Sequence, residues 1–415
     1  MLLRRSLYLC FVLCLLFALP ALAATVEVGF CSSYIPYATI QEAVNASSPG
    51  DTIYVCPGNH AEQVTIGISL TLQGLQLNPD SGAASIITVP YGGTVQNATT
   101  LGGFPVDAQI FINNGANVTL SNLTLDGRGN GVSTCGTELM GIYFQNASGT
   151  VTQSAVLNEI LPTGYTGCQA GEGIFAESNT GNWTVAVSNT IVENFQKNGI
   201  TGNGAGTILN ASNNTIIGVG PTNGAAQNGV QIAFGAAGTI TSNTVANEVW
   251  GPDTHQDSGD AASGILVYGS TGIHITSNQV TNTQYGIVVV SDTPGSGDGA
   301  TIKSNTVNAT HIFDAIDACS NGNTVSSNTI NGADQSGIHL DDTCGGTGNN
   351  NTVNSNTISL SCTGLLTGTG TTGNIATGNT YYNVITQTTP GDVCEQVPGP
   401  EKKPPHRPKV RPARH

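Results

Sequence analysis

The chain reads Ser304-Asn305-Thr306-Val307 and, 23 residues later, Ser327-Asn328-Thr329-Ile330. Copies of this phrase also begin at residues 188, 213, 242, 277 and 355, and a degenerate copy begins at residue 378. Their Asn residues, from Asn189 to Asn379, are separated by 25, 29, 35, 27, 23, 28 and 23 positions. A second phrase, Gly-Ile or Gly-Val followed by one variable residue, recurs at Gly141-Ile142, Gly173-Ile174, Gly199-Ile200, Gly229-Val230, Gly264-Ile265, Gly286-Ile287 and Gly337-Ile338. This spacing predicts one structural unit repeated along the chain.

Each period holds two or three short strands of alternating apolar residues, separated by turns of Gly, Asn and Ser. A single coil cannot bury its own apolar side, whereas stacked coils, with strands about 4.8 Å apart, bury Ile, Val and Leu in a continuous core. We expect the recurrent Asn to adopt the left-handed turn conformation and to hydrogen-bond from coil to coil as a ladder. The sequence therefore predicts an all-β fold, a parallel β-helix solenoid.

The segment near the N-terminus reads Tyr-Ala-Thr-Ile-Gln-Glu-Ala-Val at 37–44, Pro-Gly-Asp-Thr-Ile-Tyr-Val at 49–55 and Pro-Gly at 57–58. With the repeats, it resembles the right-handed parallel β-helix proteins of the pectate-lyase-like superfamily, over roughly residues 37–387. The resemblance implies a short amphipathic helix that caps the first coil. The residues agree, because Thr39 and Glu42 form a capping box and Ile40, Ala43 and Val44 form an apolar stripe.

The first 23 residues have the layout of a secretory signal peptide. Arg4 and Arg5 precede an apolar run at 7–18, and Ala21-Leu22-Ala23 is a small-x-small cleavage signal. The run is too short to span a bilayer comfortably. We expect a secreted protein, extracellular or periplasmic, without a transmembrane span. The expected divisions are a signal peptide at 1–23, an N-terminal cap with the first coil at 24–60, β-helix repeats at 61–395 and a tail at 396–415.

Charge is divided unequally along the chain. Residues 24–400 hold 25 acidic residues and three basic ones, Arg128, Lys197 and Lys303. Phosphate binding needs clusters of Lys and Arg, so nucleic acid is excluded as a partner. Neutral polysaccharides, cationic partners and divalent ions stay open, and polysaccharide is the partner we expect for a chain that we expect to be a monomer.

The tail differs from the body in composition. Its last 15 residues combine one acid, Glu401, with six basic residues interspersed with prolines: Lys402, Lys403, Arg407, Lys409, Arg411 and Arg414. Proline at this density excludes helix and ladder, so we expect an extended, disordered segment. A functional alternative is electrostatic attachment to anionic surface polymers or to the acidic body itself.

Eight cysteines follow the signal peptide, an even number that indicates disulfides in an exported chain. None forms a Cys-x-x-Cys pair, which disfavours a zinc site. Sequence alone cannot choose among the possible pairings, but proximity along the chain suggests four bonds: Cys31–Cys56, Cys135–Cys168, Cys319–Cys344 and Cys362–Cys394.

The superfamily resemblance implies four chemistries to test: polysaccharide lyases, inverting glycoside hydrolases, methylesterases and uronan epimerases. Lyases and epimerases must remove a proton next to a carboxylate of the substrate, usually with Arg, Lys, His or Tyr and often with calcium. The body has only three Lys or Arg. The hydrolase pattern is an Asp-Asp pair followed by Gly-His-Gly and Arg-Ile-Lys. Asp341-Asp342 is present, but neither later motif follows it, and the methylesterase pattern is absent.

One catalytic set emerges when the repeats are aligned. Pairing Ile316 with Ile338 places Asp317 and His339 at the same outward position of neighbouring coils, about 4.8 Å apart. Asp341 lies two residues beyond His339 and so is expected to face the same way. A His between two carboxylates can act as a general base, and two carboxylates on nearby coils suit inverting hydrolysis. The alternative is that these are ordinary polar residues of a solvated strand.

The longest insertion, between Asn243 and Asn278, supplies a second candidate. Asp253, Asp257 and Asp260 offer hard oxygen ligands, so calcium is the one cofactor we consider. Gly251, Asp253 and His255 also resemble, at three positions, the Tyr-Gly-Phe-Asp-Pro-His-Asp motif of uronan epimerases. A solvated acidic loop is the structural alternative.

The same outward row contains Tyr143 and Phe175, which are candidates for stacking on sugar rings unless the loop with Cys135 and Cys168 covers them.

The interpretation we favour is a secreted β-helix that binds polysaccharide at a cell surface or matrix without proven catalysis. One alternative is a polysaccharide-acting enzyme, an inverting hydrolase ahead of a lyase or epimerase. The other is a structural or adhesin-like surface protein.

Overall fold

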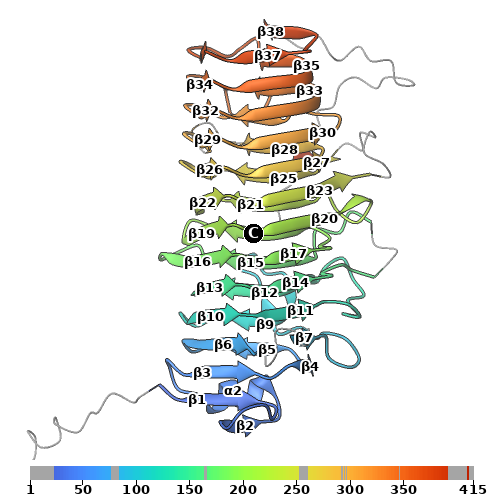
Figure 1. Cartoon of the computed structure of the whole chain (residues 1–415), viewed down its shortest axis with the longest axis vertical. Helices are drawn as coiled ribbons and strands as arrows, with labels where there is room; N and C mark the ends of the chain where they lie inside the picture. Colours follow the sequence, from blue (N-terminus) through green and yellow to red (C-terminus); the bar gives the residue numbers. More distant parts are fainter. Residues whose placement is uncertain are drawn as a thin grey trace, which may run out of the picture.

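The protein forms a long stack of coils in which successive strands lie side by side along one axis (Figure 1). The structure, a computed structural model, describes residues 23–75, 84–162, 166–251, 260–290, 293, 295, 297–344, 346–390 and 409–410. Residues 1–22, where the signal peptide is predicted, lie outside this set. No helix among the described residues is long and apolar enough to cross a membrane.

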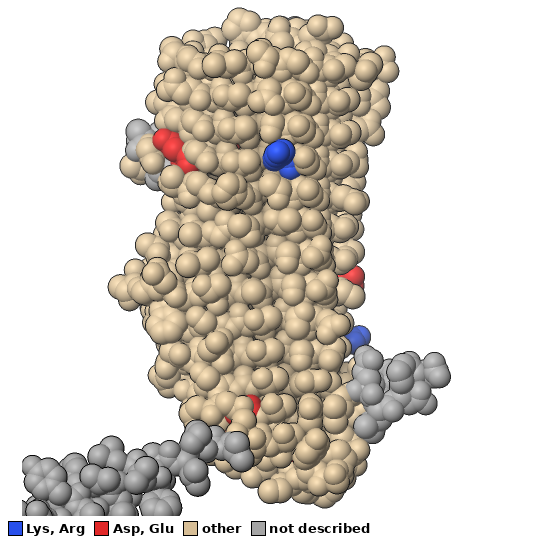
Figure 2. Space-filling view, turned by 60° about the vertical axis from the view of Figure 1, so that its left-hand side comes forward, with Lys and Arg blue, Asp and Glu red and all other residues tan. Residues whose placement is uncertain are grey.

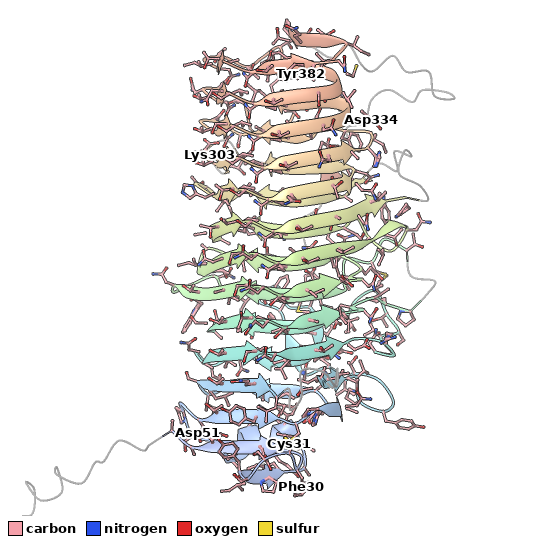
Figure 3. All side chains as sticks on the ribbon, viewed as in Figure 1. Phe30, Cys31, Asp51, Lys303, Asp334 and Tyr382 are labelled. Atoms are coloured by element: carbon pink, nitrogen blue, oxygen red, sulfur yellow. A yellow bond between two sulfur atoms is a disulfide. The ribbon has the colours of Figure 1, made fainter. Side chains whose placement is uncertain are left out.

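Three faces of parallel strands build the stack. The first face is a 14-stranded sheet of β2 (Ile35–Tyr37), β1 (Thr25–Val28), β3 (Thr52–Val55), β6 (Leu70–Gly74), β10 (Asn117–Ser121), β13 (Ser148–Thr152), β16 (Trp183–Ser188), β19 (Thr207–Ser212), β22 (Ala237–Thr241), β26 (His274–Thr276), β29 (Thr301–Lys303), β32 (Thr324–Ser326), β34 (Thr352–Asn354) and β36 (Ile375–Thr377). Charged side chains are sparse on this side of the molecule (Figure 2), from which Lys303 projects (Figure 3).

The other two faces belong to one 23-stranded sheet. The second face contains β4 (Gly58–Ala61), β7 (Ser85–Thr88), β11 (Leu123–Asp126), β14 (Ala155–Leu157), β17 (Ile191–Glu193), β20 (Thr215–Thr222), β23 (Thr244–Trp250), β27 (Gln279–Thr283), β30 (Thr306–Thr310) and β37 (Thr380–Tyr382). The third face contains β5 (Val64–Ile66), β9 (Pro105–Ile112), β12 (Glu138–Gln145), β15 (Glu172–Glu177), β18 (Asn198–Asn203), β21 (Asn228–Ala233), β25 (Ser263–Tyr268), β28 (Tyr285–Val290), β31 (Ile316–Cys319) and β38 (Thr386–Pro390). The longer strands β33 (Thr329–Leu340) and β35 (Thr357–Thr367) continue from the second face into the third.

The Ile or Val of each Gly-Ile phrase points into the core and pairs with its counterpart on the next coil, as in Ile174 with Ile200 and Ile200 with Val230. The preceding glycine is required by packing. A Cβ at Gly173 would lie 2.4 Å from a methyl of Val192, and one at Gly199 would lie 2.5 Å from a methyl of Ile216. The phrase therefore places a side-chain-free position where the second face packs against the third.

The predicted asparagine ladder is present in the turns between the first and second faces. Asn278 Nδ2 donates to Asn305 Oδ1 at 3.0 Å, and Asn305 Nδ2 donates to Asn328 Oδ1 at 3.0 Å. The predicted left-handed conformation is wrong for most of these Asn residues, because the positive φ belongs to the residue before, as at Ser277, Ser304 and Ser327. That preceding residue makes the turn, and the turn directs the Asn side chain inward to the ladder.

The one predicted helix is α2 (Ile40–Ala46), at the N-terminal end of the stack (Figure 1). Thr39 and Glu42 form the predicted capping box. Ile40, Ala43 and Val44 are buried in the continuous core, so the predicted apolar stripe of the helix faces this core.

Three disulfides match the predicted pairing: Cys31–Cys56, Cys135–Cys168 and Cys319–Cys344. Cys362 is disulfide-bonded as well. Its predicted partner, Cys394, lies outside the described residues.

Candidate functional site

The variable residue of each Gly-Ile phrase forms a row on the outward side of the third face. Strand pairing aligns Phe111, Tyr143, Phe175, Thr201, Gln231, Leu266, Val288, Asp317 and His339 from coil to coil. We call these nine residues the outward row. All nine are buried, although an outward position on a solenoid would ordinarily meet solvent.

Asp317 and His339 are paired across β31 and β33, the register that the repeat alignment predicts. Both are buried. His339 Nδ1 lies 3.0 Å from Asp314 Oδ2, and Asp314 Oδ1 accepts a hydrogen bond from the Ser336 amide at 3.0 Å. The ring is therefore held by a carboxylate that is itself fixed by the backbone, a suitable arrangement for proton transfer.

A carboxylate that the sequence analysis did not single out, Asp314, contacts this imidazole. Asp341 Oδ1 accepts from the Thr343 amide at 2.8 Å, beside the Cys319–Cys344 disulfide. Strand β33 ends at Leu340, so Asp341 lies just past the end of the strand, and its catalytic role stays a prediction.

Asp314, Asp317 and His339 offer ligand atoms that all lie within 4.8 Å of one another. A histidine nitrogen with two carboxylates suits transition metals better than calcium. The other two such groups among the described residues contain Cys31 with Cys56, and Cys319 with Cys344, whose sulfurs are already joined in disulfides.

Tyr143 and Phe175 are buried, with 0% and 1% of their surfaces exposed, so neither ring offers an exposed stacking surface in this structure and sugar binding by them stays a prediction. Phe111 stacks on Tyr143 at 5.2 Å between ring centroids. The Tyr143 hydroxyl donates to Glu177, whose carboxylate also accepts from the Leu101 amide at 2.7 Å. Part of the cover is the hairpin of β8 (Ala98–Thr99) with β9, whose Ala98 packs on this aromatic cluster. The loop with Cys135 and Cys168 was the cover considered from the sequence.

The acidic insertion is described only in part. Asp253, Asp257 and His255 lie outside the described residues, and Asp260 begins the short strand β24 (Asp260–Ala261). The calcium site therefore stays a prediction.

A polar network on β15, β18 and β21 was missed by the sequence analysis. Thr201 Oγ1 donates to Glu172 Oε2 at 2.9 Å, and Asn198 Nδ2 contacts both Thr201 Oγ1 and Gln231 Oε1 at 2.9 and 3.0 Å. The network continues from Asn228 Nδ2 to Asn198 Oδ1 at 3.0 Å and from Gln231 Nε2 to Asn203 Oδ1 at 2.9 Å. All six residues are buried. We call them the polar network: Glu172, Asn198, Thr201, Asn203, Asn228 and Gln231.

Burial determines the electrostatics of this network. Removal from water, and then the neighbouring Glu138 carboxylate, raises the pKa of Glu172 to about 8, while the Thr201 hydrogen bond and the Lys197 ammonium act in the opposite direction. Lys197 is fully buried, and its Nζ donates to the Ala226 carbonyl at 2.6 Å. Glu172 is therefore partly protonated near neutral pH and can donate as well as accept a hydrogen bond.

A signal for this network is present in the sequence. The residue before the Gly of the phrase is polar in three successive repeats, as Glu172, Asn198 and Asn228, and the variable residue is Thr201 and then Gln231. Reading the two outward positions of each repeat together, rather than searching for pairs of acids, would have found it.

A family model described as a right-handed β-helix region matches residues 198–381. No curated protein matches the chain. Among solved structures, a GH136 lacto-N-biosidase from Eubacterium ramulus superposes with a TM-score of 0.57 at 12% identity, over 87% of this chain and 68% of the other. The catalytic domain of a GH87 alpha-1,3-glucanase in complex with tetrasaccharides gives 0.54 at 14% identity, over 90% and 69%.

The A-module of the Azotobacter vinelandii mannuronan C-5 epimerase gives a TM-score of 0.52 at 13% identity, over 87% of this chain and 95% of the module. Identities this low show the fold alone. The predicted fold, a right-handed parallel β-helix, is thereby confirmed.

Proposed function

We propose that this right-handed parallel β-helix protein is exported and binds a neutral polysaccharide along the outward side of its third face. The polar network carries the proposal. It places amide, hydroxyl and carboxyl groups on three consecutive coils, each about 4.8 Å from the next.

The chemistry of these groups suits sugar hydroxyls. A hydroxyl both donates and accepts, and Asn, Gln and a partly protonated Glu offer both functions from planar, rigid groups. Strands hold such groups more firmly than loops do. The acidic body repels polyanionic sugars, which favours a neutral chain. The similar structures include a lacto-N-biosidase and an alpha-1,3-glucanase, both of which act on sugars by name.

Access is the main requirement of the proposal. Because the network is buried, a glycan reaches it only after the chain segments above it move aside. Association with a glycan should therefore be slow, or should require a conformational change that uncovers the third face.

The first prediction is a loss of glycan binding on substitution of the network. On an array of neutral glycans, Gln231→Ala or Asn198→Ala should weaken binding about tenfold, because one buried hydrogen bond contributes on the order of 1.4 kcal/mol. Asn210→Ala, on β19 of the first face, is the matched control and should bind like the parent chain. Equal binding by Gln231→Ala and the control would contradict the proposal, and repeating the array without calcium tests the loop at 253–260.

Enzymatic hydrolysis is the second candidate function, favoured by the His339–Asp314 contact beside Asp317. The carboxylates of Asp314 and Asp317 are closer than the roughly 6.5–9.5 Å that inversion needs, so a base role for His339 is better supported than a two-carboxylate mechanism. The sequence alone predicts a different pair of carboxylates for inversion, Asp317 and Asp341, and that pair stays a prediction.

If the protein is an enzyme, His339→Ala and Asp341→Asn should each reduce turnover of a neutral glycan at least about a hundredfold, the order expected for a lost general acid or base. Melting temperatures, measured in parallel, should stay within a few degrees of the parent. Turnover that survives both substitutions would move the site to the loop at 253–260. Binding of a glycan without turnover would contradict the enzymatic function and leave glycan binding as the proposed function.

Export and assembly are also proposals. The three disulfides support an oxidising compartment, as in secreted proteins. We expect a monomer. A structural or adhesin-like role is the outcome if neither binding nor turnover is found on any glycan.

A further inference from the structure

A short piece of the basic tail is placed against the body. β39 (Lys409–Val410) pairs in parallel with β24, with Asp260 opposite Lys409 and Ala261 opposite Val410. These residues are about 150 positions apart in sequence, so the pairing brings the C-terminal tail to the insertion between Asn243 and Asn278.

β24 lies over the outward side of the third face. Ala261 is fully buried in an apolar cluster with Leu266 of β25, Val288 of β28 and Phe313 before β31. Leu266 and Val288 belong to the outward row, between Gln231 on one side and Asp317 on the other. The tail strand is therefore adjacent to the middle of the row, with the polar network toward the N-terminal end and the Asp314–Asp317–His339 group toward the other.

The tail and the body carry charges of opposite sign. The last 15 residues carry six Lys or Arg and one acid, whereas residues 24–400 hold 25 acids and three Lys or Arg. Two carboxylates, Asp314 and Asp317, lie next to the cluster that contains Ala261, since Asp317 pairs with Val288 and Asp314 follows Phe313. Lys197 is the only Lys or Arg that the described strands and turns bring to this side, and no Arg is present between residues 129 and 406.

The tail is also long enough to reach from the end of β38 to the middle of the outward row. From Pro390, at the end of β38, to Lys409 there are 19 residues, which span about 60 Å in the extended conformation of proline-rich chains. From β38 to β25 there are five strand spacings, about 24 Å. The five residues after Val410 extend about 15 Å more, which corresponds to the three spacings from β25 to β15.

We propose that the Pro/Lys/Arg-rich tail binds in cis to the acidic outward side of the third face, anchored by β39 on β24. The occupant of the face is thus the chain's own C-terminus. The consequence for sugar binding rests on the proposed function: a neutral glycan has to displace the tail to reach the polar network.

The test uses the full chain in two forms. In the neutral-tail variant, the six basic residues of the tail are changed to Gln. A labelled synthetic peptide of residues 396–415 should bind this variant with a Kd in the micromolar range, and the parent chain at least tenfold more weakly, because the tethered tail competes at an effective concentration near millimolar. Raising the salt from 0.05 to 0.5 M should weaken binding at least threefold.

Two controls locate the contact. Asp317→Asn, added to the neutral-tail variant, should weaken peptide binding, whereas Glu193→Gln on β17 should not.

In the parent chain, trypsin should cut the Lys409–Val410 bond more slowly than the same bond in the free peptide. Equal peptide binding by the parent and the neutral-tail variant, or equal cleavage rates, would overturn the inference. Peptide that binds polygalacturonate but not the neutral-tail variant would assign the tail to an anionic surface polymer instead.

These outcomes are independent of sugar binding. If the peptide does not bind while Gln231→Ala still weakens glycan binding, the cis contact fails and the proposed function stands. If the peptide binds and no glycan does, the cis contact of the tail stands and the proposed function fails.

Discussion

Replacing Asn305 with alanine is expected to lower the free energy of unfolding by about 3–5 kcal/mol, the largest effect of any single substitution discussed for this protein. Asn305 Nδ2 donates to the Ile275 carbonyl at 2.9 Å and to Asn328 at 3.0 Å, and its Oδ1 accepts from the Asn278 amide at 2.9 Å. Alanine removes these bonds and leaves buried backbone groups of Ile275 and Asn278 without this partner. Each such group costs about 1–3 kcal/mol.

The matched control is Asn210→Ala, since Asn210 lies half-buried on β19 and accepts one side-chain hydrogen bond, from Thr239 at 3.0 Å. We expect it to cost less than about 1 kcal/mol. Both variants are compared by equilibrium unfolding in urea. Similar decreases in the free energy of unfolding for the two variants would mean that an Asn of the ladder contributes no more to stability than the half-buried Asn210.

Replacing Glu159 with glutamine is expected to stabilise the protein at neutral pH relative to acidic pH and to flatten its pH dependence. Both carboxyl oxygens of Glu159 are buried without a hydrogen-bond partner among the described residues. Burial, and then the neighbouring Asp126 carboxylate, raises the pKa of Glu159 well above its usual value of 4.5.

The sign follows from proton linkage. Between pH 4.5 and the raised pKa, the folded protein keeps the proton of Glu159 whereas the unfolded chain releases it, so the free energy of unfolding decreases as the pH rises. The slope within this window is at most about 1.36 kcal/mol per pH unit. Glutamine binds no proton in either state and removes this slope.

Unfolding measured from pH 4 to pH 8 tests this prediction. Glu159→Gln should match the parent within about 1 kcal/mol at pH 4 and exceed it at pH 7. Glu193→Gln, at a half-buried position of β17, is the matched control for the loss of one carboxyl group. Parallel pH profiles for Glu159→Gln and the parent would show that this carboxyl does not hold its proton in the folded state.

Much of the fold could be predicted from the sequence, because its determinants are local or periodic. The spacing of the Asn phrase predicts the ladder, and Thr39 with Glu42 predicts the helix start. Aligning the Gly-Ile phrases predicts the pairing of Asp317 with His339, since identical coils stack in register.

The environment of the site could not be predicted in the same way. Strand alternation distinguishes inward from outward residues but does not show what lies over the outward side. Tyr143 and Phe175 are therefore outward yet buried, because a hairpin 40 or more residues earlier packs on them. Asp314 was missed because it precedes β31 and belongs to no repeated phrase.

The central claim is that the polar network binds a neutral glycan on a face that the tail occupies. The most direct measurement is the affinity of the parent chain, the neutral-tail variant and the neutral-tail variant with Gln231→Ala for one neutral glycan taken from the array. We predict that neutralising the tail increases the affinity at least about tenfold, and that Gln231→Ala reverses most of this gain. Equal affinity of the neutral-tail variant with and without Gln231→Ala would contradict the claim.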